Sequence, residues 1–259
     1  MIIDTHAHLY YDELLNQIGD VIKRAEDAGI EKIIVPAVDY ASTLTILELA
    51  DKYKMIYGLA GVHPTEVQKV DNDELDKIYK LLDNEKIVGI GETGLDYYWD
   101  KTYIEKQKDF LRKQIEIAKD KNLPIVLHTR DSVADTISII KENLDESLKG
   151  QFHCFGGTVN EMNEVTGLNS FYVSYCGNVT YKNFKERDVV SATPLEKLLS
   201  ETDSPFLTPV PNRGKKNEPS NIVYTIKALS EIKNISENEM KSALYTNANE
   251  LFFKNGNKI

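Results

Sequence analysis

The sequence predicts an α/β fold, a (β/α)8 TIM barrel, and three observations support this prediction. Short runs of β-branched residues alternate with longer amphipathic segments along the chain, as in parallel strands joined by crossover helices. Eight such units can be traced. The length of 259 residues is close to the ~250 residues typical of one such barrel. An open, doubly wound sheet is the structural alternative, because it shows the same alternation.

Eight strands are expected where β-branched and other apolar residues cluster. The first run is brief and leads directly into Asp4, Thr5 and His6. The expected strands cover residues 2–3, 32–38, 55–62, 87–90, 124–127, 151–155, 171–174 and 198–202.

Helices are expected between the strands, where apolar residues recur at helical spacing. In the segment 12–28, Leu14, Ile18 and Val21 follow this spacing, and Gly29 acts as a stop signal. Further helices are expected at 41–53, 74–82, 104–121, 133–144, 222–232 and 237–252. The segment 205–221 is rich in Pro, Asn, Lys and Gly and is expected to be a long loop. No linker interrupts the pattern, so we expect one domain over residues 1–259.

Charge and cysteine content restrict the class of protein. Acidic residues outnumber basic ones by 41 to 31, which gives a net charge of −10 and argues against a protein that coats long duplex DNA. Metal ions could still supply positive charge locally for chemistry on phosphates. Cys154 and Cys176 are too few for a disulfide framework. With no signal-peptide pattern and no membrane-length apolar stretch, we expect a cytoplasmic protein without an obligate protein partner.

The five histidines all fall at or just beyond the carboxyl ends of expected strands. They are His6, His8, His63, His128 and His153. Active sites of this fold lie at that end of the barrel, so these side chains should converge on one mouth. His6 and His8 alternate along an extended segment and can therefore point to the same face. This distribution predicts a metal site.

Two carboxylates complete the expected site. Glu92 follows the fourth strand, and its two oxygens could bridge two cations, while Asp203 follows the eighth strand. We expect one divalent ion on His6, His8, Glu92 and Asp203, and a second ion on Glu92, His128 and His153. Such a pair fits a two-metal site. Glu92 and Asp203 are the expected catalytic residues, with Asp203 as general base towards a water.

Donors for phosphate are expected near the metals. His63 follows the third strand, Arg130 follows His128, and Arg213 lies with Lys215 and Lys216 in the long loop. His63, Arg130 and Arg213 are the expected phosphate contacts, although the cationic loop could equally be a solvated surface. The aromatic residues 97–99 could stack on nucleobases or could cap the barrel as part of its core.

Five segments resemble the signature motifs of the TatD-type deoxyribonucleases. They are 4–9 (DTHAHL), 91–96 (GETGLD), 153–157 (HCFGG), 201–205 (ETDSP) and 213–219 (RGKKNEP). The resemblance runs from about residue 2 to Phe252. It implies a barrel with a divalent-metal site and deoxyribonuclease activity, often 3′→5′ on single strands. It also implies the same six ligands: His6, His8, Glu92, His128, His153 and Asp203.

The expected substrate is therefore a DNA strand end or a short oligonucleotide, and the expected cofactors are two divalent ions. Imidazoles with carboxylates suit Zn²⁺ or Mn²⁺, whereas Mg²⁺ prefers oxygen ligands, and the family resemblance implies Mg²⁺ activation. A small-molecule amidohydrolase or phosphoesterase on the same barrel is the nearest alternative. Many such enzymes carry a carboxylated Lys after the fourth strand, and here no Lys occurs from that strand to Lys101. A non-catalytic metal-binding protein is the other alternative.

Overall fold

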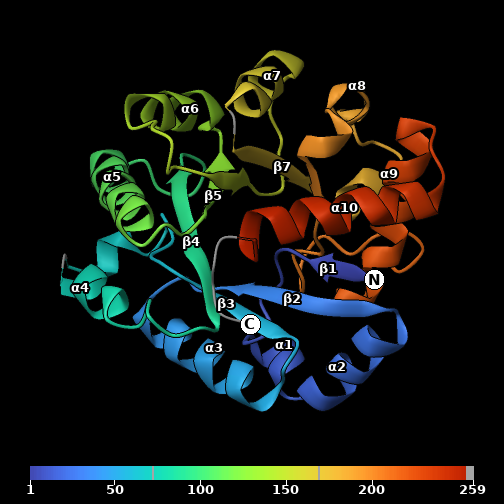
Figure 1. Cartoon of the computed structure of the whole chain (residues 1–259), viewed down its shortest axis with the longest axis horizontal. Coiled ribbons are helices and arrows are strands. Elements are labelled where there is room, and N and C mark those ends of the chain that lie inside the picture. The colour runs from blue at the N-terminus through green and yellow to red at the C-terminus, as the bar shows by residue number, and fades with distance from the viewer. Residues whose placement is uncertain (72, 169, 255–259) are drawn as a thin grey trace.

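The computed structural model describes residues 1–71, 73–168 and 170–254 and confirms the predicted barrel. All eight strands form one sheet in chain order, and neighbouring strands are parallel (Figure 1). A bridge between Ala7 and Ser204 joins the segments that follow the first and last strands, so the sheet curves back on itself. This sequential order excludes the doubly wound alternative, in which the strand order reverses.

The strands lie close to the expected positions, with the largest difference in the fourth. Their bounds are β1 (Ile2–Asp4), β2 (Ile30–Pro36), β3 (Ile56–Ala60), β4 (Ile87–Asp96), β5 (Ile125–Arg130), β6 (Gly150–Phe152), β7 (Phe171–Tyr175) and β8 (Leu198–Ser200). Strand β4 continues six residues beyond its expected end at Ile90, and every residue in it is buried. Glu92 therefore lies within this strand and not in a loop after it.

Helices surround the strands in Figure 1, and short 3-10 turns occur in several connections. The helices are α1 (Asp12–Leu15), α2 (Ile18–Asp27), α3 (Tyr40–Lys52), α4 (Asp73–Tyr79), α5 (Ile104–Asp120), α6 (Val133–Glu142), α7 (Val159–Gly167), α8 (Arg187–Ala192), α9 (Ile222–Lys233) and α10 (Glu237–Phe252). The expected helix 12–28 is divided, because Gln17 leaves helical geometry at φ −133°. Helices α7 and α8 were not expected. In the described part of the chain, no helix has the length and apolar character to cross a bilayer.

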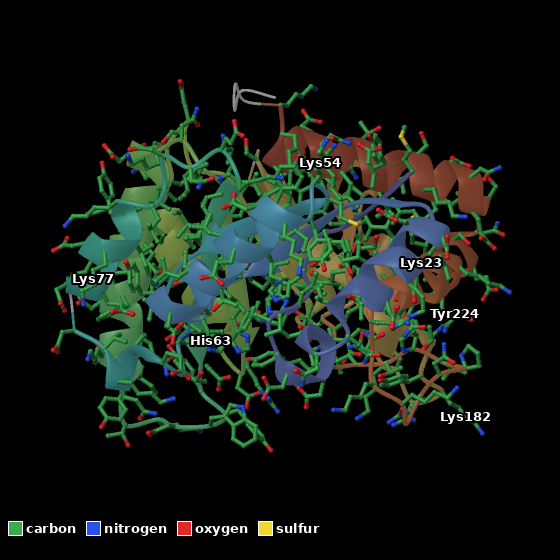
Figure 2. The ribbon with its side chains drawn as sticks, turned by 90° about the horizontal axis from the view of Figure 1, so that it is seen from below. Lys23, Lys54, His63, Lys77, Lys182 and Tyr224 are labelled. Atoms are coloured by element: carbon green, nitrogen blue, oxygen red, sulfur yellow. The ribbon has the colours of Figure 1, made fainter. Side chains whose placement is uncertain are left out.

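An apolar layer fills the barrel below its mouth. Inward-facing side chains of seven strands meet three side chains of α10: Ile3, Ile34, Leu59, Val88, Val126, Tyr172 and Leu199 with Ala248, Leu251 and Phe252. Helix α10 packs on β1 and β8 and so covers the amino-terminal end of the barrel. In Figure 2, Lys54 before β3 lies in the upper part of the view, towards α10, and His63 after β3 lies in the lower half. The other end of the barrel is left for the polar residues.

Strands β4 and β5 are in close contact at Gly94. Their register shifts between Ile90 and Thr93, a bulge that turns the backbone around Glu92. At Gly94, φ is 132°, and a Cβ atom there would collide with the carbonyl oxygen of His128. Only glycine meets both demands, the backbone angle and the close approach.

We expect Gly94→Ala to destabilise the protein by about 2–4 kcal/mol, because β5 would have to move away from β4. For a chain of this size, the melting temperature should fall by about 5–12 °C in thermal unfolding followed by circular dichroism. Gly156→Ala is the matched control, since a Cβ at Gly156 has nothing within 4 Å. Equal melting temperatures for the two variants would contradict the close-approach argument.

Candidate metal centre

Alternation along the strands carries polar side chains to the mouth of the barrel. Residues two apart on a strand share a face. Val126 and Leu199 belong to the inner apolar layer, so His128 on β5 and Glu201 after β8 face the interior one step higher. The first strand differs, because the chain bends at Thr5 before His6. That bend turns the His-x-His segment towards the same mouth.

The carboxylate of Glu92 is the centre of the cluster, and its two oxygens face different histidines. Oε2 lies 3.2 Å from Nε2 of His6 and 3.5 Å from Nε2 of His8. Oε1 lies 2.9 Å from Nδ1 of His128 and 2.9 Å from Nε2 of His153. The side chain of Glu92 is only 3% exposed. One buried carboxylate therefore contacts two pairs of imidazoles, one through each oxygen.

His6, His8 and Asp203 form the group on the Oε2 side. The Nε2 atoms of the two histidines are 3.2 Å apart, and Oδ1 of Asp203 lies 3.8 Å from His6 and 3.6 Å from His8. Donor atoms around a tetrahedral ion at ~2.1 Å are ~3.4 Å from one another. The separations between these donors and Glu92 Oε2 are therefore of the size that one ion requires.

His128 is held from outside by a second carboxylate. Its Nε2 lies 2.9 Å from Oδ2 of Asp96, the buried last residue of β4. In the metal-free chain Nδ1–H donates to Oε1 of Glu92 at 2.9 Å; a metal ion would displace that proton and use the Nδ1 lone pair, while Nε2–H stays on Asp96. Metal-binding histidines usually have such a partner, which sets the tautomer and the ring orientation.

His153 has the same kind of support. Its Nδ1 lies 3.3 Å from Oε1 of Glu201, and this buried carboxylate also accepts hydrogen bonds from the backbone N–H of Cys154, from Gln151 and from Ser174. On the other side of the cluster, Nδ1 of His8 lies 3.2 Å from the hydroxyl oxygen of Tyr10. His6 has no such partner among the described residues, but its ring stacks on His153 at 3.9 Å.

His63 is arranged in the opposite way. The backbone N–H of Thr65 donates to its Nδ1, and the Thr65 hydroxyl is 2.7 Å from the same atom. Since Nδ1 accepts, the proton of the neutral ring is on Nε2, which lies 3.3 Å from Oε1 of Glu92. His63 therefore keeps its N–H towards the centre, whereas His128 and His153 keep an N–H on their outer carboxylates and could give up the inner proton to a metal ion.

The pKa values of the cluster reflect burial and close charges in the metal-free chain. Burial lowers the pKa of His6, His8 and His63. Burial acts in the same direction on His128 and His153, but hydrogen bonds and the charge of Glu92 raise their pKa values above the ordinary range.

The pKa values of two inward-facing carboxyl groups, Glu92 and Asp203, shift in opposite directions. Burial opposes ionisation of Glu92, but the surrounding histidines hold its pKa well below the usual value. Burial raises the pKa of Asp203 to about 8. The raised pKa means that the charged form of Asp203 is disfavoured in the metal-free chain, and a cation beside it would favour that form.

The donor set fits divalent metal ions. His6, His8 and Asp203 bring three donor atoms within 4.8 Å of one another, and so do His63, Glu92 and His128. Imidazole and carboxylate donors suit Zn²⁺ and Mn²⁺. The structure thus brings together all six expected ligands, and His63 lies beside them.

The expected cationic contacts lie on exposed segments. Arg130 ends β5, and its guanidinium carbon is 3.9 Å from the ring centre of Tyr98. Arg213 lies 4.3 Å from the ring centre of Tyr181, and no contact with the histidine cluster is found for it among the described residues. Lys216 pairs with Glu13 at 3.2 Å, as a solvated surface residue does.

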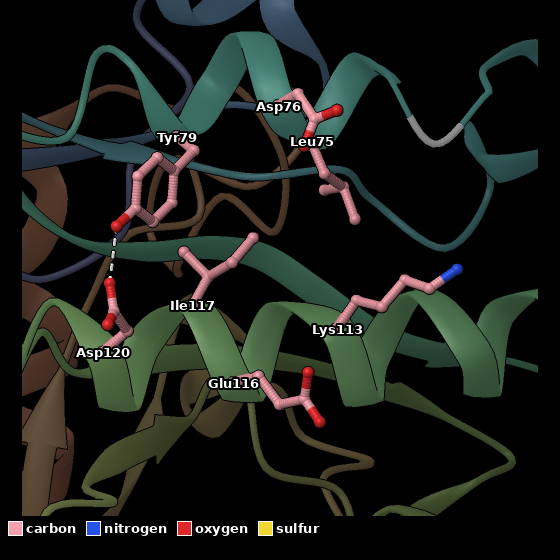
Figure 3. A pocket seen from close by; sticks show the side chains of 7 residues that line it. All are labelled: Leu75, Asp76, Tyr79, Lys113, Glu116, Ile117 and Asp120. Atoms are coloured by element: carbon pink, nitrogen blue, oxygen red, sulfur yellow. Dashed lines mark hydrogen bonds between the residues drawn. The ribbon is translucent and has the colours of Figure 1, made fainter.

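One surface cavity lies away from this centre. It has a volume of about 490 Å³ and lies between α4 and α5 (Figure 3). Its lining contains Asp76, Glu116 and Asp120 but no histidine, and Tyr79 bonds to Asp120 across it. The cavity offers none of the donors that converge at the barrel mouth, so the cluster around Glu92 is the better candidate site.

A TIM barrel with histidines and carboxylates at its mouth defines the class of metal-dependent barrel hydrolases. The sequence model of the family described as TatD related DNase matches residues 3–253. An uncharacterized metal-dependent hydrolase, YabD of Bacillus subtilis, is 41% identical over 97% of this chain and 99% of its own. The crystal structure of YJJV, a TatD homologue from Escherichia coli, has a TM-score of 0.92 at 30% identity, covering 97% of both chains.

A TatD family hydrolase from Entamoeba histolytica has a TM-score of 0.87 at 28% identity, covering 97% of this chain and 98% of its own. The chain belongs to the TatD family and is a metal-dependent hydrolase.

Sequence reasoning did not assign roles to Asp96 and Glu201. Both lie inside the quoted motifs, GETGLD and ETDSP, but they contact the outer nitrogens of the histidines and not the centre. The general need of metal-binding histidines for an outer acceptor could have marked them as candidates.

We expect Asp96→Asn and Glu201→Gln each to weaken Zn²⁺ or Mn²⁺ binding about 10–100-fold, because each removes a charged acceptor behind a histidine. Isothermal titration calorimetry of the metal-stripped chain measures this. Asp135→Asn is the control, since its carboxylate accepts from Tyr97 on the same rim but touches no histidine. Wild-type affinity in both variants would show that the outer carboxylates do not support metal binding.

Proposed function

We propose that this hydrolase cleaves phosphodiester bonds in DNA, acting on single-stranded ends or short oligonucleotides with two divalent ions. One observation carries the proposal: the two carboxylate oxygens of Glu92 face different pairs of histidines. A carboxylate shared in this way is suited to bridge two ions ~3.5–4 Å apart, the spacing used in two-metal phosphoester hydrolysis. The deoxyribonuclease name of the matching family supports the same chemistry.

The proposed ions have different ligands. One would be held by His6, His8, Glu92 and Asp203, and the other by Glu92, His128 and His153. Divalent ions in such a centre supply Lewis acidity towards the phosphate and lower the pKa of water to the neutral range. Zn²⁺ or Mn²⁺ suits these donors better than Mg²⁺ does.

Asp203 is the proposed general base. Its Oδ1 faces His6 and His8, while Oδ2 has no hydrogen-bond partner among the described residues. The side chain is 13% exposed, so water can reach it from the mouth. We expect Oδ2 to accept the proton of the attacking water and to direct that water towards phosphorus.

His63, Arg130 and Arg213 are the proposed phosphate contacts. The Nε2–H of His63 already points into the centre, towards a position where a carboxylate oxygen is its partner. A phosphate oxygen could take the place of that partner and would receive a hydrogen bond that strengthens as charge develops. Arg130 and Arg213 would hold neighbouring phosphates in bidentate fashion.

The charge of the whole chain favours short contacts with substrate. With a net charge of −10, the protein lacks the cationic track that a long duplex needs for tight, salt-dependent binding. Cationic side chains at one mouth are sufficient for a strand end.

End-labelled single-stranded DNA, duplex DNA and RNA, incubated with Mn²⁺-, Mg²⁺- or Zn²⁺-loaded protein, test the activity. We expect the single strand to be shortened fastest, and chelation to abolish cleavage until metal is restored. Asp203→Asn should lower turnover at least ~10²-fold while most metal stays bound, because a base is lost and the other ligands remain.

Asp120→Asn, on the far end of α5, is the control and should match the wild type. Cleavage that survives chelation, or hydrolysis of cyclic amides or lactones without DNA cleavage, would contradict the proposal.

Alanine substitutions of His63 and His128 should have different effects on metal content, because only His128 is a proposed metal ligand. We expect His63→Ala to keep metal content near wild type and to lower kcat about 10²–10³-fold, the effect of losing one donor to a developing charge. His128→Ala should lose metal. Metal analysis by mass spectrometry and steady-state kinetics separate these effects, and loss of metal in His63→Ala would make His63 a ligand.

A further inference from the structure

Two large aromatic side chains are exposed beside the metal centre. Tyr98 is 55% exposed and Trp99 is 68% exposed, and both follow β4 directly. Their rings are 5.0 Å apart and nearly perpendicular. Trp99 is the single tryptophan of the chain. Exposed aromatic rings that adjoin a functional site are candidates for ligand contact.

The loop that carries these rings is tied to a proposed metal ligand. Oδ1 of Asp96 accepts the backbone N–H of Tyr98 at 2.9 Å and that of Trp99 at 3.1 Å. Oδ2 of the same carboxylate lies 2.9 Å from Nε2 of His128. Both rings are therefore positioned by a residue that also positions the centre.

Tyr97, the first aromatic of the run, has a different role. Its hydroxyl donates to Asp135 on α6 at 2.7 Å, and the side chain is partly buried against the core. It therefore braces the loop against the neighbouring helix. Of the three aromatic residues, Tyr98 and Trp99 are the exposed ones.

Arg130 adds a cation to this exposed surface. Its guanidinium carbon lies 3.9 Å from the ring centre of Tyr98 and 5.3 Å from that of Trp99. It forms no ion pair with any residue that the structure describes, in a chain with excess negative charge. A guanidinium placed over a ring keeps its N–H groups available for a phosphate.

We infer that Tyr98, Trp99 and Arg130 form a nucleobase-stacking subsite for an unpaired base next to the scissile phosphate. The inference rests on the proposed function and extends it to substrate selection. Ring faces accept any base, and a neighbouring cation neutralises the next phosphate. Bases within a duplex are already stacked and paired, so this subsite selects single strands through access to the base.

Fluorescence of Trp99 tests base contact without turnover. The probes are a dT tetranucleotide and an abasic oligonucleotide with the same number of phosphates, added to the Zn²⁺-loaded Asp203→Asn protein. We expect saturable quenching by dT and at least ~10-fold weaker binding of the abasic probe, because stacking is lost. Trp99→Phe gives the background. Equal titrations with both probes would overturn the inference.

Kinetics with single-stranded DNA provide the second test. Trp99→Ala should raise KM about 10-fold with kcat within about 2-fold, and Trp99→Phe should recover most of the loss. Tyr79→Ala is the matched control, since Tyr79 is also exposed and also has a cation over its ring, Lys121 at 4.3 Å, but lies at the cavity of Figure 3.

Trp99→Ala should have a higher KM than Tyr79→Ala, whose KM should match the wild type. Equal KM values for the two variants would overturn the inference. If no variant cleaves DNA, the proposed function fails, and the fluorescence titration alone decides the subsite.

Discussion

The site depends on one constraint, a buried carboxylate that must be neutralised from both sides. Glu92 is held inside β4. Nitrogens of His6, His8, His128 and His153 lie between 2.9 and 3.5 Å from its oxygens, and the Nε2 atom of His63 is a fifth, at 3.3 Å. A buried carboxylate without such partners would be costly. The parallel barrel satisfies this need, because the carboxyl ends of all its strands meet around one axis. The bulge in β4 supplies the remaining condition by turning Glu92 towards that axis.

Proton placement differs among the similar histidines of this cluster. His128 and His153 direct N–H groups outward to Asp96 and Glu201, so a metal ion would displace only the inner protons that bond to Glu92 in the metal-free chain. His63 accepts from Thr65 on its outer side and so directs its N–H inward. Residue type alone does not distinguish these roles, since all are imidazoles at strand ends. The outer partner of each ring decides what it offers to the centre.

The sequence predicted the barrel and the residues of the cluster because both follow from local patterns. Short apolar runs mark the strands, and residues immediately after them must lie at the mouth. The outer carboxylates could not be assigned in the same way, because the contact of Glu201 with His153 depends on how β6 and β8 are spaced across the barrel. The division of residues 12–28 and the length of β4 also depend on tertiary packing, which overrides the periodic pattern.

The length of β4 matters for the site, because the strand ends at Asp96, which contacts His128. Had this strand ended at Ile90, no buried carboxylate would stand between His128 and the exposed loop. Because β4 continues, one side chain accepts from a histidine of the centre with one oxygen and from the backbone of Tyr98 and Trp99 with the other. The geometry of the centre and the geometry of the rim are therefore determined by the same residue. A substrate that rests on the rim would meet ligands already oriented by the group that holds the rim in place.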